Sequence, residues 1–98
     1  MELTNQNFYD EISSGLVLVD FYATWCGPCK MMHPVINSID DSHPELKVIK
    51  IDVDKHNEIA RKYGVMSIPT ILLFENGEIK QKNIGFIPQE VIEDWLKN

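Results

Sequence analysis

Residues 19–30 read Val-Asp-Phe-Tyr-Ala-Thr-Trp-Cys-Gly-Pro-Cys-Lys and place two cysteines, Cys26 and Cys29, where the sequence pattern changes. On the N-terminal side, Leu16–Tyr22 is an almost continuous apolar run, which is typical of a central strand covered on both faces. On the C-terminal side, apolar residues recur with helical spacing between residues 32 and 39. The proline between the cysteines suits a first helical turn, where its missing N–H costs nothing. We therefore expect the cysteines at the start of a helix that follows a buried strand.

The rest of the chain alternates between short helical and strand-like segments. Asn76-Gly77 stands between two β-prone runs and is a strong signal for a hairpin. The early strands, which helices separate, are expected to pair in parallel through right-handed crossovers, whereas the closing hairpin must be antiparallel. The sequence therefore predicts an α/β fold with a mixed central sheet of four to five strands, flanked by helices on both faces. Helices are expected at 5–14, from the cysteine motif to 39, at 55–63 and at 88–97, and strands at 16–22, 47–53, 70–74 and 78–82.

Length and charge limit the possible functions. A chain of 98 residues is shorter than a typical domain of roughly 150 residues, so we expect one domain spanning 1–98. The net charge of −6 disfavours binding to nucleic acid or to an anionic membrane, and so small an acidic domain is expected to be a monomer. Even the longest apolar runs, such as Leu16–Val19, are too short to cross a bilayer. Residues 1–6 lack the pattern of a signal peptide, which favours a cytoplasmic protein.

The two cysteines are suited to reaction rather than to stabilisation. A disulfide between positions three apart closes a very small loop, so it would add little stability. A helix N-terminus favours the thiolate, which is the reactive form of cysteine. Cys26 can then attack a disulfide, and Cys29 can resolve the resulting mixed disulfide. The alternative is half of a zinc site, but His33, His43 and His56 lack the spacing that would complete it, so we expect no bound metal.

Residues 19–30 resemble the active-site signature of the thioredoxin family, and the resemblance extends over essentially the whole chain. It includes Lys50–Asp54, Tyr63-Gly64-Val65, Ile68-Pro69-Thr70, Asn76-Gly77 and Gly85. The resemblance implies a thioredoxin fold in a reductant of protein disulfides. The first strand of the family would be cut to about residues 1–3, so that sheet edge is expected to be short or absent.

The resemblance also implies a role for each matching residue. Cys26 matches the attacking cysteine, Cys29 the buried resolving cysteine, and Asp20 the buried acid that helps to deprotonate the resolving thiol. An Asp within an apolar strand is costly to bury, so we expect desolvation to raise the pKa of Asp20. Lys50 matches a lysine near that acid, with a lysine that merely extends into solvent as the alternative. His33, one turn after Cys29, is either a cation that tunes the thiols or a partly exposed helix residue.

A docking surface for clients is implied around the cysteines. Pro69 matches a cis-proline of the family, and the backbone before it, here Ile68, pairs with the bound client like an added strand. Trp25 is expected to be exposed and to stack on the client rather than to lie in the core. Ser67 replaces a frequent glycine, Met66 adds an apolar side chain, and Tyr22 replaces a frequent tryptophan. The expected surface comprises Trp25, Gly27, Pro28, Val65, Met66, Ser67, Ile68, Pro69, Gly85 and Phe86.

Three functions remain open at this point. The favoured one is a cytoplasmic dithiol reductant with no bound cofactor besides its own disulfide. The resemblance implies that a thioredoxin reductase, a flavoprotein that carries FAD and uses NADPH, returns it to the dithiol form. The second is an oxidase or isomerase of an oxidising compartment, although members with that role more often have histidine between the cysteines. The third is a binding module whose redox chemistry is incidental.

Overall fold

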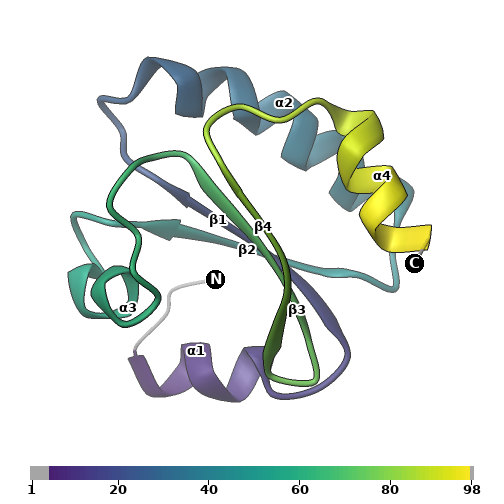
Figure 1. Ribbon diagram of the computed structural model, residues 1–98, viewed down its shortest axis with the longest axis horizontal. Coiled ribbons are helices and arrows are strands. Elements are labelled where there is room, and N and C mark those ends of the chain that lie inside the picture. The colour runs from purple at the N-terminus through teal and green to yellow at the C-terminus, as the bar shows by residue number, and fades with distance from the viewer. Residues whose placement is uncertain (1–4, 98) are drawn as a thin grey trace.

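A four-stranded sheet lies between two pairs of helices in the computed structural model, which describes residues 5–97 (Figure 1). The helices are α1 (Asn5–Ile12), α2 (Gly27–Ser42), α3 (Asn57–Lys62) and α4 (Gln89–Lys97), and the strands are β1 (Leu16–Tyr22), β2 (Lys47–Asp52), β3 (Thr70–Glu75) and β4 (Glu78–Ile84). The predicted mixed sheet with helices on both faces is confirmed. The expected short first strand at residues 1–3 lies outside the described residues.

The apolar strand β1 lies in the interior of the sheet, whose order is β2-β1-β3-β4. Residues 17–21 are all buried, because β1 has a strand on each side and helices on each face. Alternate residues of β1 enter different cores, since successive side chains of a strand point to opposite faces. Val17, Val19 and Phe21 belong to the core that also contains Phe8 of α1 and Ile59 of α3.

The second core lies between the sheet and the other two helices, α2 and α4. Leu18 of β1 packs there with Met32 and Ile36 of α2 and Ile92 of α4. In Figure 1 this core corresponds to the upper layer, where α2 crosses the sheet beside α4. The helical spacing that predicted an apolar face on α2 is therefore explained by burial against the sheet.

The direction of β3 differs from the expectation that strands separated by helices run parallel. β1 and β2 are parallel, but β3 is antiparallel to β1, with Thr70 opposite Phe21. The chain leaves β2 and enters β3 at the same end of the sheet, since Asp52 is the register partner of Tyr22 and Thr70 that of Phe21. The connection that contains α3 therefore returns to the end where β2 left the sheet, and β3 runs back in the opposite direction.

The hairpin between β3 and β4 forms at Asn76-Gly77 as predicted. Both residues have positive φ, 50° at Asn76 and 86° at Gly77, which matches the mirror-image turn that joins strands of right-handed twist. The pairing slips between Leu73 and Phe74, where the register shows an irregularity. β4 also continues two residues beyond the predicted end, to Ile84, and so carries the chain to Gly85 beside the cysteines.

Candidate active site

The two cysteines lie at the N-terminus of α2, directly after the end of β1. Cys26 and Cys29 form a disulfide with their Cα atoms 5.2 Å apart. Cys26 is the N-cap of α2, with φ −90° and ψ 114°, and its Sγ accepts a hydrogen bond from the backbone N–H of Cys29 at 3.2 Å. The unpaired N–H groups and the partial positive charge of a helix N-terminus stabilise negative charge on the Cys26 sulfur. The geometry thus favours Cys26 as the thiolate after reduction.

The two sulfur-bearing residues differ slightly in their access to solvent. Cys26 is 5% exposed, whereas Cys29 is completely buried. They form a small apolar cluster with Ala23, against which Ile68 packs. Access to the disulfide from solvent is therefore through Cys26. This arrangement agrees with an attacking role for Cys26 and a resolving role for Cys29.

Asp20 is a buried carboxyl group without a hydrogen-bond partner. Its side chain is fully buried, and neither carboxylate oxygen is paired within the described part of the chain. Desolvation raises the pKa of Asp20 from its ordinary value of 3.8 to about 7, and the charge of Lys50 opposes part of this increase. Asp20 can therefore exchange a proton near neutral pH, where a thiol must also lose one. The sequence predicted that desolvation would raise the pKa of Asp20, and the buried position of the side chain agrees with that prediction.

Lys50 lies beside Asp20 in the sheet but reaches α2 instead of the carboxylate. The two residues are register partners on the parallel strands β1 and β2. The Lys50 side chain is exposed, and its Nζ donates a hydrogen bond to Asn37 Oδ1 at 2.7 Å. The structure thus places Lys50 near Asp20, as expected, and adds a partner on α2 that the sequence did not indicate.

His33 and Tyr22 form a ring contact on the same side of the sheet. Their ring centroids are 5.2 Å apart, in an edge-to-face arrangement. Burial lowers the pKa of His33, and the nearby Lys50 charge lowers it further. His33 is therefore a half-buried, neutral histidine at pH 7 rather than a cation beside the thiols.

Two loops approach the disulfide, one before β3 and one after β4. The Ile68–Pro69 peptide is cis, and the Ile68 carbonyl oxygen lies 3.9 Å from Cys26 Sγ. The backbone N–H of Gly85 donates to the Pro69 carbonyl at 2.8 Å, and the Thr70 hydroxyl donates to the Ser67 carbonyl at 2.6 Å. The Gly85–Pro69 bond joins the two loops, and the Thr70–Ser67 bond closes the loop before β3.

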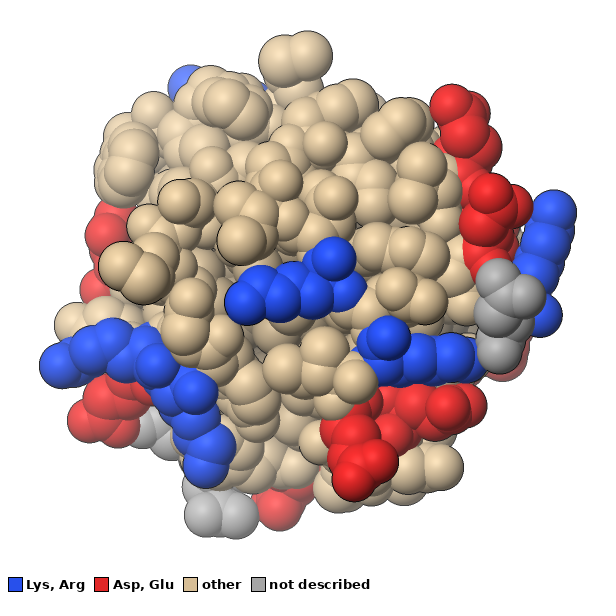
Figure 2. Space-filling model, in the orientation of Figure 1, with Lys and Arg blue, Asp and Glu red and all other residues tan. Residues whose placement is uncertain are grey.

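Most of the expected docking residues lie around this point. Trp25 is 69% exposed, Met66 95% and Phe86 46%, while Gly27, Pro28 and Ser67 are also exposed. Figure 2 shows that the upper left part of the visible face, near the start of α2 in Figure 1, carries few charged side chains. Val65 is the exception, because it packs against the core on the side of α1 and α3.

Asp54 holds Trp25 in place, a role that the sequence pattern did not reveal. The Trp25 Nε1–H donates to Asp54 Oδ2 at 2.9 Å. Asp54 follows β2, whose end adjoins the end of β1 through the hydrogen bond from Val53 N–H to the Tyr22 carbonyl at 2.9 Å. An acidic residue just after a parallel neighbouring strand was the available signal, since such strand ends meet at one edge of the sheet.

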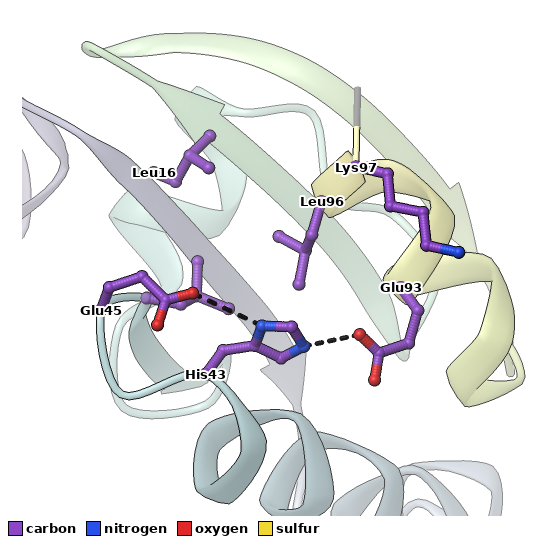
Figure 3. Close-up of a pocket in the computed structure, with 7 residues that line it drawn as sticks. Leu16, His43, Glu45, Glu93, Leu96 and Lys97 are labelled. Atoms are coloured by element: carbon purple, nitrogen blue, oxygen red, sulfur yellow. Dashed lines mark hydrogen bonds and ion pairs between the residues drawn. The ribbon is translucent and has the colours of Figure 1, made fainter.

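A hollow lies at the other end of α2, about 24 Å along the helix from the cysteines (Figure 3). Leu16, Leu46 and Leu96 line it, together with His43, Glu45, Glu93 and Lys97. Its most prominent feature is the His43 imidazole. Nε2 of His43 lies 2.5 Å from Glu93 Oε1 and Nδ1 lies 3.4 Å from Glu45 Oε1. Two carboxylates on opposite ring nitrogens favour the doubly protonated ring, and the hydrogen bond with Glu93 raises the pKa of His43.

Residues 5–97 offer neither a metal cluster nor a membrane-spanning helix. They contain no group of three or more His, Cys, Asp or Glu side chains arranged to hold a metal ion. None of their helices combines the length and apolar character needed to cross a bilayer.

Known proteins share both the sequence and the fold of this chain. The thioredoxin family model matches residues 1–98. Thioredoxin from Bacillus subtilis is 48% identical over 97 residues, which cover 98% of this chain and 93% of that protein. Thioredoxin from Listeria monocytogenes is 47% identical over 96 residues, covering 97% and 93%.

Solved structures give the same result for the fold. A mutant thioredoxin from Halobacterium salinarum superposes with a TM-score of 0.89 at 36% identity, covering 96% of this chain and 83% of that one. The oxidised mitochondrial thioredoxin 3 of Saccharomyces cerevisiae superposes with a TM-score of 0.86 at 34% identity, covering 95% and 89%. The similarity therefore extends over nearly the full length in both sequence and structure.

Proposed function

The chain belongs to the thioredoxin family and is a thiol–disulfide oxidoreductase that reduces protein disulfides, and we propose that Cys26 attacks the client and Cys29 resolves the intermediate. The observation that supports this order is the position of Cys26 at the N-cap of α2, with Cys29 fully buried one turn later. We further propose that the chain is one domain, 1–98, that acts as a cytoplasmic monomer.

The reaction proceeds by two thiol–disulfide exchanges from the reduced protein. The Cys26 thiolate attacks one sulfur of the client disulfide, which forms a mixed disulfide and releases the other client sulfur as a thiolate. The Cys29 thiol then loses its proton to Asp20, and its thiolate attacks Cys26 Sγ. This step forms the Cys26–Cys29 disulfide and releases the second client thiolate. The client gains two electrons, which the cysteine pair loses.

Asp20 suits the role of proton acceptor because its pKa of about 7 lies near the working pH. A carboxylate with an ordinary pKa would accept a thiol proton much less readily. In the other direction, a protonated Asp20 can return the proton when the disulfide is reduced again. We propose that Lys50 limits how far desolvation raises the pKa of this acid.

Clients are expected to dock on the apolar surface around the disulfide. The Ile68 backbone, held beside Cys26 by the cis-Pro69 loop, can pair with an extended client segment. Trp25, Met66 and Phe86 offer exposed apolar contacts, and Gly27, Pro28, Ser67 and Gly85 leave the approach open. The protein would need no cofactor beyond its disulfide. Its reductant would be a thioredoxin reductase that carries FAD and uses NADPH.

Trapping the mixed disulfide tests the roles of the two cysteines. Reduced Cys29→Ser protein, mixed with a disulfide-bonded client such as insulin, is expected to accumulate a covalent complex through Cys26, because resolution is lost. Cys26→Ser is the matched control and should accumulate none. Non-reducing electrophoresis and peptide mass spectrometry identify the linked cysteine. A complex formed only through Cys29 would reverse the proposed roles.

The direction of electron transfer is tested by the reduction potential, measured by equilibration with dithiothreitol. General reference values are about −270 mV for thioredoxin and about −180 mV for protein disulfide isomerase. A potential near or below the first value supports a reductant. A potential near the second would contradict the proposed direction and favour an oxidase or isomerase.

A further inference from the structure

Lys50 lies next to Asp20 in the sheet, yet its ammonium group does not pair with the carboxylate. The two residues are register partners on β1 and β2, so their side chains leave the same face of the sheet. The Lys50 Nζ instead donates a hydrogen bond to Asn37 Oδ1 on α2 at 2.7 Å. Both oxygens of Asp20 remain buried and unpaired among residues 5–97. The lysine therefore spans from β2 to α2 along the side of the buried acid.

The ammonium cannot easily follow the carboxylate into the core. Asp20 has the uncharged Ile71 as its neighbour on β3, and its own side chain is fully buried. Moving an ammonium ion from water into such surroundings is strongly unfavourable, and a single partner often fails to compensate that cost. A freed Lys50 is thus expected to turn toward solvent. The amide oxygen of Asn37 offers it a partner at the edge of α2.

Asn37 has a defined position relative to the reacting groups. Cys29, His33 and Asn37 are spaced four residues apart, so they follow one row along α2. The row begins at the resolving cysteine, which is fully buried, and reaches the exposed Asn37 two turns later. An acceptor at this point keeps the lysine charge on the same side of the helix as Asp20.

We propose that Asn37 is a positioning residue for the exchange reaction, because its amide oxygen holds the exposed Lys50 ammonium against α2, on the side of Asp20. The proposal deepens the proposed function and rests on the role of Asp20 as the proton acceptor for Cys29. Asn37 lies two turns of α2 away from Cys29. Its contribution acts through the position of one positive charge.

Two titratable groups can report where that charge lies. Asp20 interacts electrostatically with Lys50 on β2 and with Tyr22 on β1, Tyr22 also interacts with Asp52 of β2, and His33 on α2 interacts with Lys50. The Lys50 charge lowers the pKa of Asp20, and it also lowers the pKa of His33. If Lys50 moves away, both pKa values rise. Better hydration of the site would instead lower the pKa of Asp20 while raising that of His33, so the pair of signals separates the two causes.

The test is an NMR titration of the Asp20 carboxyl and the His33 ring in the oxidised protein. Asn37→Ala should move both midpoints upward, that of Asp20 by about 0.3 pH unit, a twofold change in its ionised fraction near the midpoint. Ala suits an exposed helix position, so the variant is expected to fold. The matched control is Asn37→Ala in a Lys50→Met background, where neither midpoint should move further.

Two outcomes overturn the proposal. The Asp20 midpoint could stay within error of wild type in Asn37→Ala, or it could shift by the same amount with and without Lys50. A kinetic measurement then separates this inference from the proposed function. The pH profile of mixed-disulfide resolution should shift upward with the Asp20 titration. If the titration shifts and the rate profile does not, Asn37 still positions Lys50, but Asp20 is not the proton acceptor.

Discussion

Replacing Asp20 by Asn should stabilise the folded protein, increasingly so as the pH rises. The carboxyl group is fully buried and has no hydrogen-bond partner among the described residues, so its charged form is disfavoured in the folded state. Its pKa rises from 3.8 to about 7 on folding. Each pKa unit corresponds to about 1.4 kcal/mol, so the ionised carboxyl lowers the free energy of unfolding by about 4 kcal/mol above pH 7.

The sign of the pH dependence follows from the two protonation states. Between pH 3.8 and 7, the folded protein keeps the Asp20 proton, whereas the unfolded chain releases it. The folded state then binds more protons, and its stability falls as the pH rises. The stability associated with neutral Asp20 is fully present below pH 3.8 and is lost as the pH rises through about 7. Asn cannot ionise, so its variant lacks this loss.

Urea unfolding of the oxidised proteins at several pH values between 4 and 8.5 measures the effect. The free-energy difference between Asp20→Asn and wild type should grow by about 3–4 kcal/mol over this range. Asp20→Leu is the companion variant. Leu packs differently from Asn, so the two variants are expected to differ in their free energy of unfolding at low pH. The difference between Asp20→Leu and wild type should nevertheless increase with pH by the same amount. A difference that stays constant across the range would refute the assigned pKa and the desolvation that causes it.

Two further predictions concern parts of the fold away from the cysteines. Glu93→Gln should lower the pKa of His43, measured by NMR, more than Glu45→Gln does, because the Glu93 contact is the shorter at 2.5 Å against 3.4 Å. The His43 contribution to stability is present below pH 6.5 and is lost as the pH rises through its raised pKa. Melting curves of Glu93→Gln should show a smaller loss, because only the contact with Glu45 remains, and equal pKa shifts in the two variants would contradict the assignment. Ile36→Ala, at a fully buried position of α2, should lower the free energy of unfolding by about 2–5 kcal/mol. Val91→Ala, at a position 36% exposed, should cost much less, and similar losses would show that α2 is not packed as described.

The sequence predicted most of the fold because its strongest signals are local. The apolar run of β1 was placed within its observed bounds, and Asn76-Gly77 formed the predicted turn. The direction of β3 was not predicted, since a helix between two strands does not by itself fix the end of the sheet at which the second strand begins. The sequence also did not predict the register irregularity between Leu73 and Phe74, because it arises from the pairing of β3 with β4 and not from the sequence of one strand alone.

The candidate site shows the same limit. Its cysteines were evident from their motif, whereas the supporting hydrogen bonds join residues far apart in the chain. Trp25 and Asp54 are 29 positions apart, and Asn37 and Lys50 are 13 apart. Neither pair follows a helical or strand periodicity that could reveal it. Such contacts become visible only when the sheet order brings the segments together.

The position of Asp20 links the stability of the fold to its chemistry. β1 pairs with β2 on one side and β3 on the other, and both cores pack against it. This strand can therefore hold a carboxyl group that weakens the fold by several kcal/mol. The same strand ends just before the cysteines, so the buried acid and the buried Cys29 share one rigid support. A carboxyl group left unpaired by the described residues opposes folding above pH 4, and this cost is what the proposed role of Asp20 in proton transfer at the disulfide would account for.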